Sequence, residues 1–465
     1  MRTTLVYPGI TGKGFDSLGQ GMDSGWISHG LAILAACVKE KGFAVDLLDL
    51  RALSSWDHYR EQLLARRPDV VGVSMMSVDY NPGMECLRIA REVLPDAVTV
   101  LGGPHPTLML DEVKDSPYID HIFLGEAEIT FPEFLARQQR GESSERVIPC
   151  IHPDLDALPI TDREFFLEEW RTWGYQSDSP EAPFVQELPP PFVTIITGRG
   201  CKYNCSYCQP AERFIFGRKV RQRSVSNVLS ELQELRDRYR FASFMFHDDC
   251  LTEDRDWVID FCQAYRGAGF TQPFFCQSRA DIIVKNEDMV QLMAEAGLRG
   301  YFIGFESGSD RVLRFIRKGT KRRDNLEAAR ICKKYGIAIW ANYMLGLPTE
   351  TKEEVLETIS MLKEIDPDYY SPAFYTPHPG SDLYEYCIEN NLSLIESHDG
   401  FRRNPDPCGE KIRGVDYAWL RWAVAESQRR TLPNQLKRQA RSCWHRYAQP
   451  KKIARKLGQM LSAGG

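Results

Sequence analysis

The sequence predicts an α/β protein: an N-terminal doubly wound (Rossmann-like) parallel sheet, then a partial (β/α)6 barrel and a basic helical C-terminal tail. Short β-rich runs alternate with amphipathic helical stretches through the first 140 residues, and the alternation resumes after the proline-rich run LPPPF. Strands that alternate with helices indicate parallel sheets, because parallel neighbours need a crossover connection. We therefore expect an N-terminal domain, a linker, a barrel and a C-terminal region at residues 1–140, 141–190, 191–385 and 386–465.

Five strand-helix units fill the N-terminal domain. The strand candidates are TTLVYP, AVDLLDL, VVGVSMM, TVLGGP and HIFLG. Helical stretches begin near Ser28, Trp56, Pro82 and Leu108, and a last one runs from Ala127 to about Gln139. Ligands of doubly wound sheets bind beyond the carboxyl ends of the strands. The loops after these strands are therefore the candidate binding site.

The barrel is predicted from six further strand candidates, after a segment without sustained periodicity that we interpret as a structured linker. These strands are PFVTIITGRG, ASFMFHDD, PFFCQSR, GYFIGFES, IAIWANYMLG and DYYSPAFYT. Helical stretches separate them at about 224–239, from 255, and near 287–296, 324–335 and 351–365. Parallel barrels collect their active groups at the carboxyl ends of the strands.

Composition limits the function classes. The chain has 43% hydrophobic and 26% charged residues, and no run approaches the roughly 20 apolar residues that span a bilayer. The N-terminus does not read as an export signal, so we expect a cytoplasmic protein. Its thirteen cysteines are scattered, which favours reduced thiols and metal ligation over a disulfide scaffold. We expect Cys37, Cys86, Cys262 and Cys332 to be small buried hydrophobes.

The C-terminal tail differs in charge from the rest of the chain. From Ser427 onward it contains ten Lys or Arg and no Asp or Glu, whereas the whole chain has a net charge of -6. Such a segment can contact a membrane surface, a polyanion or the acidic body of the protein. A simple solvated basic helix is the alternative.

Three cysteines point to the chemistry. Cys201, Cys205 and Cys208 follow the first barrel strand as CKYNCSYC. Three thiolates can ligate three irons of a cubane cluster and leave the fourth iron open to a small molecule. A structural zinc would need a fourth protein ligand, for which Cys250 or Cys276 would have to be recruited. The spacing therefore favours a [4Fe-4S] cluster.

The CxxxCxxC triad, with the aromatic Tyr207 before its last cysteine, resembles the signature of the radical S-adenosylmethionine (SAM) superfamily. In that family the open iron chelates the amino and carboxylate groups of SAM. One electron from the reduced cluster then cleaves SAM to a 5'-deoxyadenosyl radical, which abstracts hydrogen from carbon. The resemblance also implies a reductant such as flavodoxin or ferredoxin as a partner.

The same resemblance assigns SAM contacts to the ends of the later barrel strands. Asp248 or Asp249, in HDD where the family has Gly-Gly-Glu, would accept from the methionine ammonium. Arg279 would pair with the methionine carboxylate, and Glu306 would bind the ribose or the amino group. The segment NYMLGLPTET resembles the family's GxIxGxxE region, which flanks adenine. The positions that we carry over from it are Met344, Leu345 and Gly346.

The first domain resembles the cobalamin-binding domain of cobalamin-dependent radical SAM enzymes, a group that includes C-methyltransferases and the anaerobic magnesium-protoporphyrin ester cyclases. The resemblance rests on three strand-end motifs, SMMS, GGPH and GEAE, the last in place of the usual GEGE. The cobalamin contacts that it implies are Ser74, Met75, Ser77, Gly102, Gly103, Pro104, His105, Gly125, Glu126 and Glu128.

The cobalt-ligating motif DxHxxG of methionine synthase is absent after the first strand, where PGITGKGFDSLGQG stands instead. Cobalamin would therefore bind without histidine ligation of cobalt. We expect His29 and His105 to cap or hydrogen-bond. The alternative is a nucleotide-binding or purely structural doubly wound domain, although no G-x-G-x-x-G follows the first strand to indicate a nicotinamide site.

These observations predict an enzyme that methylates an unactivated carbon of a biosynthetic intermediate, with methylcobalamin as methyl donor to the substrate radical. Radical cyclisation or oxidative rearrangement with the same cofactors is the alternative. A remote one is an iron-sulfur or zinc protein that holds RNA through the basic tail. The substrate would be a small molecule, or a lipid or tetrapyrrole that the tail meets at a membrane.

Overall fold

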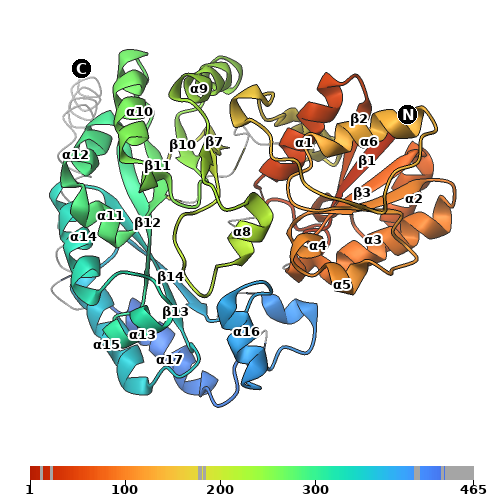
Figure 1. The fold of residues 1–465 in the computed structure, drawn as a ribbon. Coiled ribbons are helices and arrows are strands. Elements are labelled where there is room, and N and C mark those ends of the chain that lie inside the picture. The colour runs from red at the N-terminus through yellow and green to blue at the C-terminus, as the bar shows by residue number, and fades with distance from the viewer. Residues whose placement is uncertain are drawn as a thin grey trace, which may run out of the picture.

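Two parallel sheets of six strands each stand side by side in the computed structural model (Figure 1). The structure describes residues 1–10, 14–20, 25–175, 181, 185–402, 409–430 and 434. The basic tail expected after Ser427 therefore lies almost entirely outside the described residues. Within them, no helix is long and apolar enough to cross a membrane.

The first sheet has the strand order β2-β1-β3-β4-β5-β6, and every pairing in it is parallel. Its strands are β1 Arg2–Tyr7, β2 Ala44–Asp49, β3 Val70–Ser74, β4 Val98–Gly102, β5 His121–Phe123 and β6 Val147–Ile148. The order reverses between β1 and β3, which is the topological switch point where open α/β sheets bind ligands.

Helices cover both faces of this sheet, as the doubly wound prediction requires. They are α1 His29–Glu40, α2 Trp56–Arg66, α3 Tyr80–Val93, α4 Pro104–Leu108, α5 Leu110–Val113 and α6 Thr130–Gln139, with 3-10 turns η1 Leu50–Ala52 and η2 Ser77–Asp79. One core packs β1 and β4 against α1 and α6, and a second packs β3 against α2 and α3. Local chemistry defines the helix starts, since the hydroxyls of Ser28 and Ser55 accept from the first turns of α1 and α2.

The segment expected to be a linker does more than connect the sheets. It contributes β6, the 3-10 turn η3 Leu155–Ala157 and helix α7 Glu164–Thr172. Phe166 and Trp170 of α7 are fully buried in the first core, and Trp170 Nε1 donates to Asp49 Oδ2 at 2.9 Å. Burial of these two aromatic side chains packs α7 against the first sheet, while Arg163, just before α7, pairs with Glu231 of the second half at 2.9 Å.

The second sheet has the sequential order β14-β13-β12-β11-β10-β7, again entirely parallel. Its strands are β7 Phe192–Ile195, β10 Ser243–Phe246, β11 Phe274–Ser278, β12 Leu298–Glu306, β13 Ala338–Leu345 and β14 Tyr369–Phe374. Because each strand adds beside the previous one, the sheet winds in one direction. This is the predicted partial (β/α)6 barrel, with β7 and β14 at its open edges.

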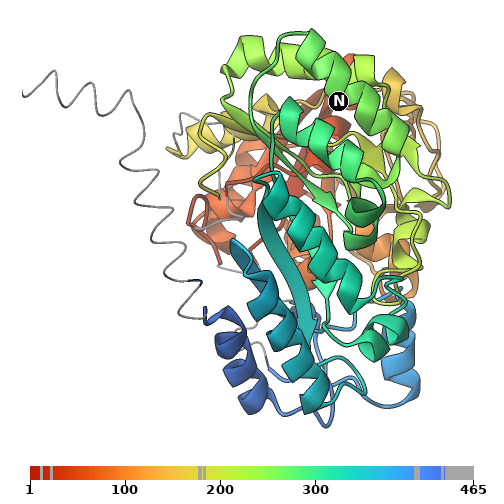
Figure 2. The same ribbon diagram turned by 90° about the vertical axis from the view of Figure 1, so that its left-hand side faces the viewer.

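Helices cover the outer side of this sheet, as Figure 2 shows. They are α9 Val225–Tyr239, α10 Arg255–Gly267, α11 Ala280–Lys285, α12 Glu287–Ala296, α13 Asp310–Phe315, α14 Arg322–Lys334, α15 Lys352–Ile365 and α17 Tyr417–Gln428, with the turn η4 Leu251–Glu253. Ser224 and Thr351 cap α9 and α15 with their hydroxyls. The expected helix positions in the barrel are confirmed to within a few residues.

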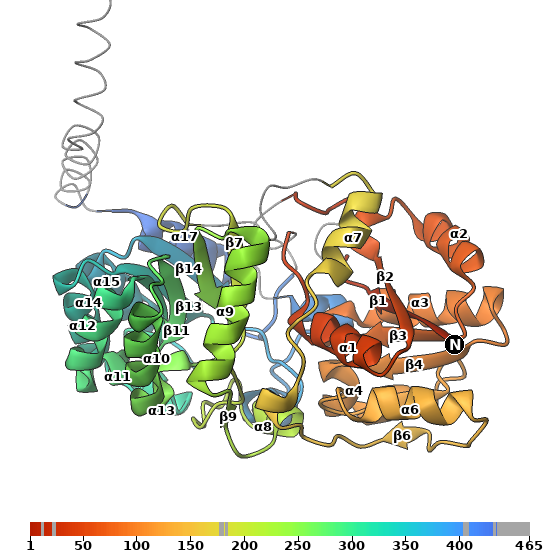
Figure 3. The same ribbon diagram turned by 90° about the horizontal axis from the view of Figure 1, so that it is seen from above.

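Three smaller pieces lie near the boundary of the halves. A two-stranded hairpin pairs β8 Gly198–Arg199 with β9 Arg221–Gln222, and α8 Ala211–Phe216 stands between its strands in sequence. Seen from above, α8 and β9 lie between the two halves (Figure 3). After the barrel, α16 Asp382–Glu389 leads to the turn η5 His398–Phe401, which packs against η2 and α3 of the first half.

Candidate active site between the two sheets

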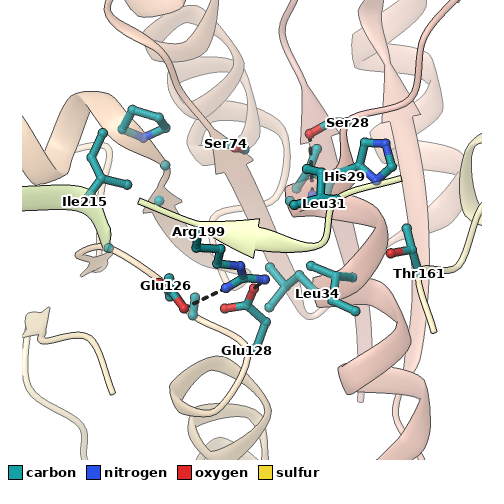
Figure 4. Close-up of a pocket in the computed structure, with 18 of the residues that line it drawn as sticks. Ser28, His29, Leu31, Leu34, Ser74, Glu126, Glu128, Thr161, Arg199 and Ile215 are labelled. Carbon is teal, nitrogen blue, oxygen red and sulfur yellow. Dashed lines mark hydrogen bonds and ion pairs between the residues drawn. The ribbon is translucent and has the colours of Figure 1, made fainter. Parts of the chain in front are cut away.

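A cavity of about 550 Å³ lies where the carboxyl ends of the first sheet face the second half. Figure 4 shows residues of both halves around it, including Ser74 and Glu126 from the first and Arg199 from the second. The predicted cobalamin contacts that line it are Ser74, Gly102, Gly103, Pro104, Gly125, Glu126 and Glu128. The second half adds Thr197, His247 and Asp249 to the wall.

Three predicted cobalamin contacts, Met75, Ser77 and His105, do not line this cavity. Met75 is fully buried in the core under α3. His105 is also fully buried, and its Nδ1 lies 3.1 Å from Ser77 Oγ. Met76, which the sequence analysis did not select, lines the cavity instead. The signal was present, because Ser74 and Met76 are two residues apart in an extended segment and therefore share a face.

Gly103 illustrates how the first half makes room. Its φ of 99° lies in a region that side chains rarely adopt. A Cβ there would stand 2.8 Å from the backbone nitrogen of Met75. The loops after β3 and β4 are joined at this point, since the Met75 N–H donates to the Gly102 carbonyl at 2.9 Å. Glycine thus lets two strand-end loops pack together below the cavity.

The GEAE turn is tied to the second half by ion pairs. Arg199 donates to Glu126 Oε2 and Glu128 Oε1, both at 2.6 Å (Figure 4). Arg221 also pairs with Glu126. Burial opposes the charge of Arg199, yet Glu128 and Glu126 hold its pKa above the usual value. These carboxylates therefore join β8 and β9 to the first sheet. Arg199, the last residue of β8, precedes Cys201 by two residues.

Two neutral imidazoles face the same space. His29 Nε2 lies 2.7 Å from Thr194 Oγ1, which agrees with the hydrogen-bonding role expected for it. Burial lowers the pKa of His29 well below its usual value and lowers that of His247 to about 4. The buried Nε2 of His247 has no hydrogen-bond partner among the described residues. A molecule in the cavity would find a polar atom there, together with glycine-lined backbone, and this set fits a large cofactor.

The cysteine triad lies in the loop after β8. The N–H groups of Cys208 and Gln209 donate to the Cys205 carbonyl at 3.0 and 2.8 Å, which closes a tight turn. Arg279 Nη1 donates to Cys205 Sγ at 3.6 Å, so a cation stands beside the sulfur, as suits an anionic cluster.

A mononuclear zinc fits this loop less well. Among the described residues, the three thiols do not form a group close enough to share one ion. Cys276, proposed above as a possible fourth ligand, is fully buried in the core of the second half, and the Cys250 thiol lies 3.9 Å from Thr252 Oγ1. The wide spacing of the triad suits a cubane, whose irons each take one thiolate.

A charged triangle stands beside the triad. Tyr207 OH donates to Glu306 Oε1 at 3.0 Å, and Lys318 Nζ lies 2.9 Å from that oxygen and 3.1 Å from the phenol. Burial, with Glu306 next, raises the pKa of Tyr207 well above its usual value. Glu306 has a φ of 62° at the end of β12, a strained conformation of the kind that clusters at functional sites. Lys318 was not identified from the sequence.

Of the other predicted SAM contacts, Asp249 lines the cavity, whereas Arg279 and Asp248 bond to neighbouring residues. Arg279 pairs with Asp281 at 3.0 Å and its guanidinium stacks over Tyr203. Asp248 accepts from the Thr197 N–H and hydroxyl at 3.0 and 2.7 Å and so braces the loop after β7. Burial raises the pKa of Asp248 to about 7. Of the two aspartates, Asp249 is the one that lines the cavity.

The two side chains predicted to flank adenine in the fifth strand lie in different surroundings. Leu345 is fully buried in the core between sheet and helices, whereas Met344 is only partly buried and packs in the same cluster as Tyr207. Alternation along β13 puts the two side chains on opposite faces, so Leu345 cannot flank a ligand on the Tyr207 side. Gly346, with φ 76°, donates its N–H to Glu350 Oε2 at 2.7 Å.

Comparison with known families agrees with this fold and this site. Residues 195–362 match the model of the radical SAM superfamily, and residues 23–135 match the B12 binding domain. The chain is a member of the radical SAM superfamily with a B12-binding domain before the barrel. Its cofactors are accordingly a [4Fe-4S] cluster, SAM and cobalamin.

Relatives include both methyltransferases and cyclases. The chain is 28% identical over 381 residues to an uncharacterized methyltransferase of Pyrococcus horikoshii, covering 78% of this chain and 79% of that protein. It is 27% identical over 405 residues to the anaerobic magnesium-protoporphyrin IX monomethyl ester cyclase of Rubrivivax gelatinosus, covering 83% of this chain and 70% of that protein. A hopanoid C-3 methylase of Methylococcus capsulatus is 24% identical over 360 residues, with 76% and 67% covered.

Two solved structures share the fold. The cobalamin-dependent radical SAM enzyme OxsB matches with a TM-score of 0.67 at 17% identity, over 87% of this chain and 64% of that one, so this chain spans less than two thirds of OxsB. The radical SAM methyltransferase TsrM of Kitasatospora setae matches with a TM-score of 0.65 at 17% identity, over 91% and 88%. Both likenesses support the two-domain architecture.

Proposed function

We propose that this enzyme methylates an unactivated carbon atom of a small-molecule substrate. When bound, the cluster supplies the electron that cleaves SAM to a 5'-deoxyadenosyl radical, and cobalamin supplies the methyl group. The observation that carries the proposal is the pairing of Arg199 with Glu126 and Glu128. It holds the GEAE turn of the cobalamin domain against β8, the strand that leads into the loop that bears the cysteines.

The chain's own residues would position SAM. Arg279 carries a buried positive charge next to Cys205 and suits the methionine carboxylate. Glu306 is held by Tyr207 and Lys318 through Oε1, which leaves Oε2 for a ribose hydroxyl or the ammonium. The partly buried Met344 supplies apolar surface for adenine. Methyltransferases among the relatives support this use of the site.

The test is product stoichiometry. Anaerobically reconstituted protein would be supplied with cobalamin, SAM, a strong reductant and extracts from a strain that lacks the gene, in which the substrate accumulates. We expect a product heavier by one methyl group in place of one hydrogen, with one S-adenosylhomocysteine and one 5'-deoxyadenosine for each product. Formation of 5'-deoxyadenosine without S-adenosylhomocysteine would contradict methylation.

Radical cyclisation is the second candidate, favoured by the similarity to the magnesium-protoporphyrin ester cyclases. It uses the same residues for SAM but leaves the carbon count unchanged. In the assay above it would give a substrate mass lowered by hydrogen loss and no S-adenosylhomocysteine. The two outcomes therefore separate the candidates in one experiment.

We also propose two partners. A flavodoxin or ferredoxin would deliver the electron to the cluster, and replacement of the chemical reductant by flavodoxin and its reductase should sustain turnover. The basic tail would contact anionic membrane surfaces, and co-sedimentation with phosphatidylglycerol vesicles should fall when the chain is truncated after Asn434. A truncated chain that sediments equally well would contradict the membrane contact.

A further inference from the structure

A second cluster of metal-type ligands lies outside the active site. His105 on α4, Glu112 on α5 and His398 on η5 each present a ligand atom, and these atoms all lie within 4.8 Å of one another. Glu112 Oε2 is 2.7 Å from His398 Nε2 and 3.7 Å from His105 Nε2. The trio joins the first half to the segment that follows the barrel, 286 residues further along the chain.

His105 gives the strongest indication of a metal site. Its side chain is fully buried, and its Nε2 has no hydrogen-bond partner among the described residues. Its other ring nitrogen, Nδ1, lies 3.1 Å from Ser77 Oγ. Metal-ligating histidines are held in this way, with the far nitrogen hydrogen-bonded so that the near one presents its lone pair.

Aromatic packing holds both rings. Tyr80 stacks on His398 with ring centroids 3.8 Å apart and planes within 11°. The same tyrosine meets the His105 ring edge-on at 5.1 Å, and Phe401 packs against His398 from another side at 5.8 Å. The two imidazoles are therefore oriented by groups other than Glu112.

We propose that His105, Glu112 and His398 bind a divalent transition-metal ion of the zinc class. Two imidazole nitrogens and one carboxylate oxygen, with water as the fourth ligand, form a common tetrahedral zinc set. At bond lengths of about 2.0–2.2 Å, neighbouring ligand atoms of such a site stand roughly 3.3–3.5 Å apart. The observed 2.7 and 3.7 Å lie on either side of this spacing, so small side-chain shifts would admit the ion.

The ion would link two segments of the chain. His105 directly follows Gly103 and Pro104, which line the cavity, and η5 packs against η2 and α3. A metal bound here would fasten the segment after the barrel to the loops that follow β3 and β4. The inference does not depend on methyl transfer, because none of its ligands lines the cavity or contacts the triad.

The experiment uses the full-length protein with its cluster reconstituted, stripped of loosely held metals with EDTA. Zinc is then titrated against a chromophoric chelator, and bound zinc and iron are measured by mass spectrometry. His398→Gln and Glu112→Gln remove ligands at partly exposed positions. His121→Gln and Asp111→Asn are their controls, since His121 bonds only to the Glu145 carbonyl and Asp111 to Lys114 among the contacts described.

We expect the unaltered protein and both controls to hold one zinc per chain and to melt at a higher temperature with zinc. The two ligand variants should bind zinc at least about 100-fold more weakly and lose that thermal shift, with cluster iron unchanged. Cobalt(II) in place of zinc should give the intense visible bands of a four-coordinate site in the unaltered protein.

Equal zinc affinity in the unaltered protein and in both ligand variants would overturn the proposal. So would the absence of tightly bound zinc and of a four-coordinate cobalt spectrum in the unaltered protein. The trio would then be a hydrogen-bonded contact between η5 and the first half. Because 5'-deoxyadenosine formation is assayed separately, failure of this proposal is distinguishable from failure of the proposed function.

Discussion

The two sheets differ in the residues that follow their strands. After the strands of the first sheet, Gly102, Gly103 and Gly125 line the cavity, so that backbone can approach a bound molecule closely. After the strands of the second sheet lie ion pairs, such as Glu306 with Lys318 and Arg279 with Asp281. A bulky cofactor needs room and polar backbone, whereas a smaller charged molecule such as SAM needs charges at set positions.

Topology explains part of this contrast. The first sheet reverses its order beside β1, which opens a crevice at one point of its edge. The second sheet adds strands in one direction, so the ends of β7, β10, β11 and β12 face a common interior. Side chains from separate loops can then meet around one small molecule. The first sheet offers one crevice, and the second a converging ring of strand ends.

The strongest way to separate the two regions is to remove the cluster. Cys205→Ala should remove one of the three cysteine ligands of the cluster, and 5'-deoxyadenosine formation should fall by about 10³-fold or more, because no other group can supply the electron. Iron content and SAM cleavage are the measurements. Cobalamin binding to the first half should stay within about twofold of normal. Cys262→Ala, a fully buried core cysteine on α10, is the control and should keep its iron.

The charged triangle tests whether paired charges position SAM. Lys318→Met leaves Glu306 buried with Tyr207 as its remaining partner in the triangle, a change that costs about 3–5 kcal/mol when a buried pair is broken. We expect SAM cleavage to fall by about 100-fold while iron content is retained. Lys334→Met, which removes an exposed pair with Glu287, should leave cleavage unchanged. Normal cleavage by a folded Lys318→Met protein would remove this triangle from the SAM site.

The glycine-lined region can be tested at Gly103. Gly103→Ala places a Cβ 2.8 Å from the Met75 nitrogen in a left-handed conformation, at a cost of about 1–3 kcal/mol. Equilibrium binding of cobalamin should weaken by about 10-fold, with cluster iron unaffected. Gly141→Ala is the matched control, because its φ is 70° and its Cβ would meet nothing within 4 Å. Equal cobalamin affinity in both variants would show that the close approach at Gly103 does not shape the site.

The smallest effect concerns pH in the second region. Burial raises the pKa of Glu350 to about 8, although the N–H groups of Gly346 and Leu347 favour its charged form. The fold thus prefers the neutral acid: its contribution is complete below about pH 4.5 and is lost as the pH rises through about 8. Glu350→Gln should gain stability relative to the unaltered protein between pH 5 and 8, by about 1.4 kcal/mol per pH unit in urea unfolding.

The exposed Glu353 on the first turn of α15 gives the comparison for that measurement. Glu353→Gln should show a stability difference that does not change over the same pH range. If Glu350→Gln behaves like Glu353→Gln, then Glu350 is ionised in the folded protein at no cost. The prediction that the Glu350 carboxyl is neutral in the folded protein would then be wrong.

Local patterns were enough to predict most elements. Helix starts at Ser28, Ser224 and Thr351 coincide with hydroxyls that cap them, because capping is an interaction between residues three apart. The α7 helix was not separated from the linker, since its aromatic residues have meaning only against a sheet already formed. The burial of Met75 and Leu345 was not foreseen for a related reason: alternation shows that neighbours point in opposite directions but not which direction faces a ligand.

The sequence by itself determined the order of strands and helices, the cysteine loop, and the strand ends at which ligands bind, because these depend on periodicity, capping and spacing within short segments. Only the tertiary structure decided that Lys318 would join Tyr207 and Glu306, that Arg199 would reach Glu126 and Glu128, and that His398 would meet His105. Those contacts link residues separated by tens to hundreds of positions. Their energies depend on burial and mutual geometry, which no local pattern encodes.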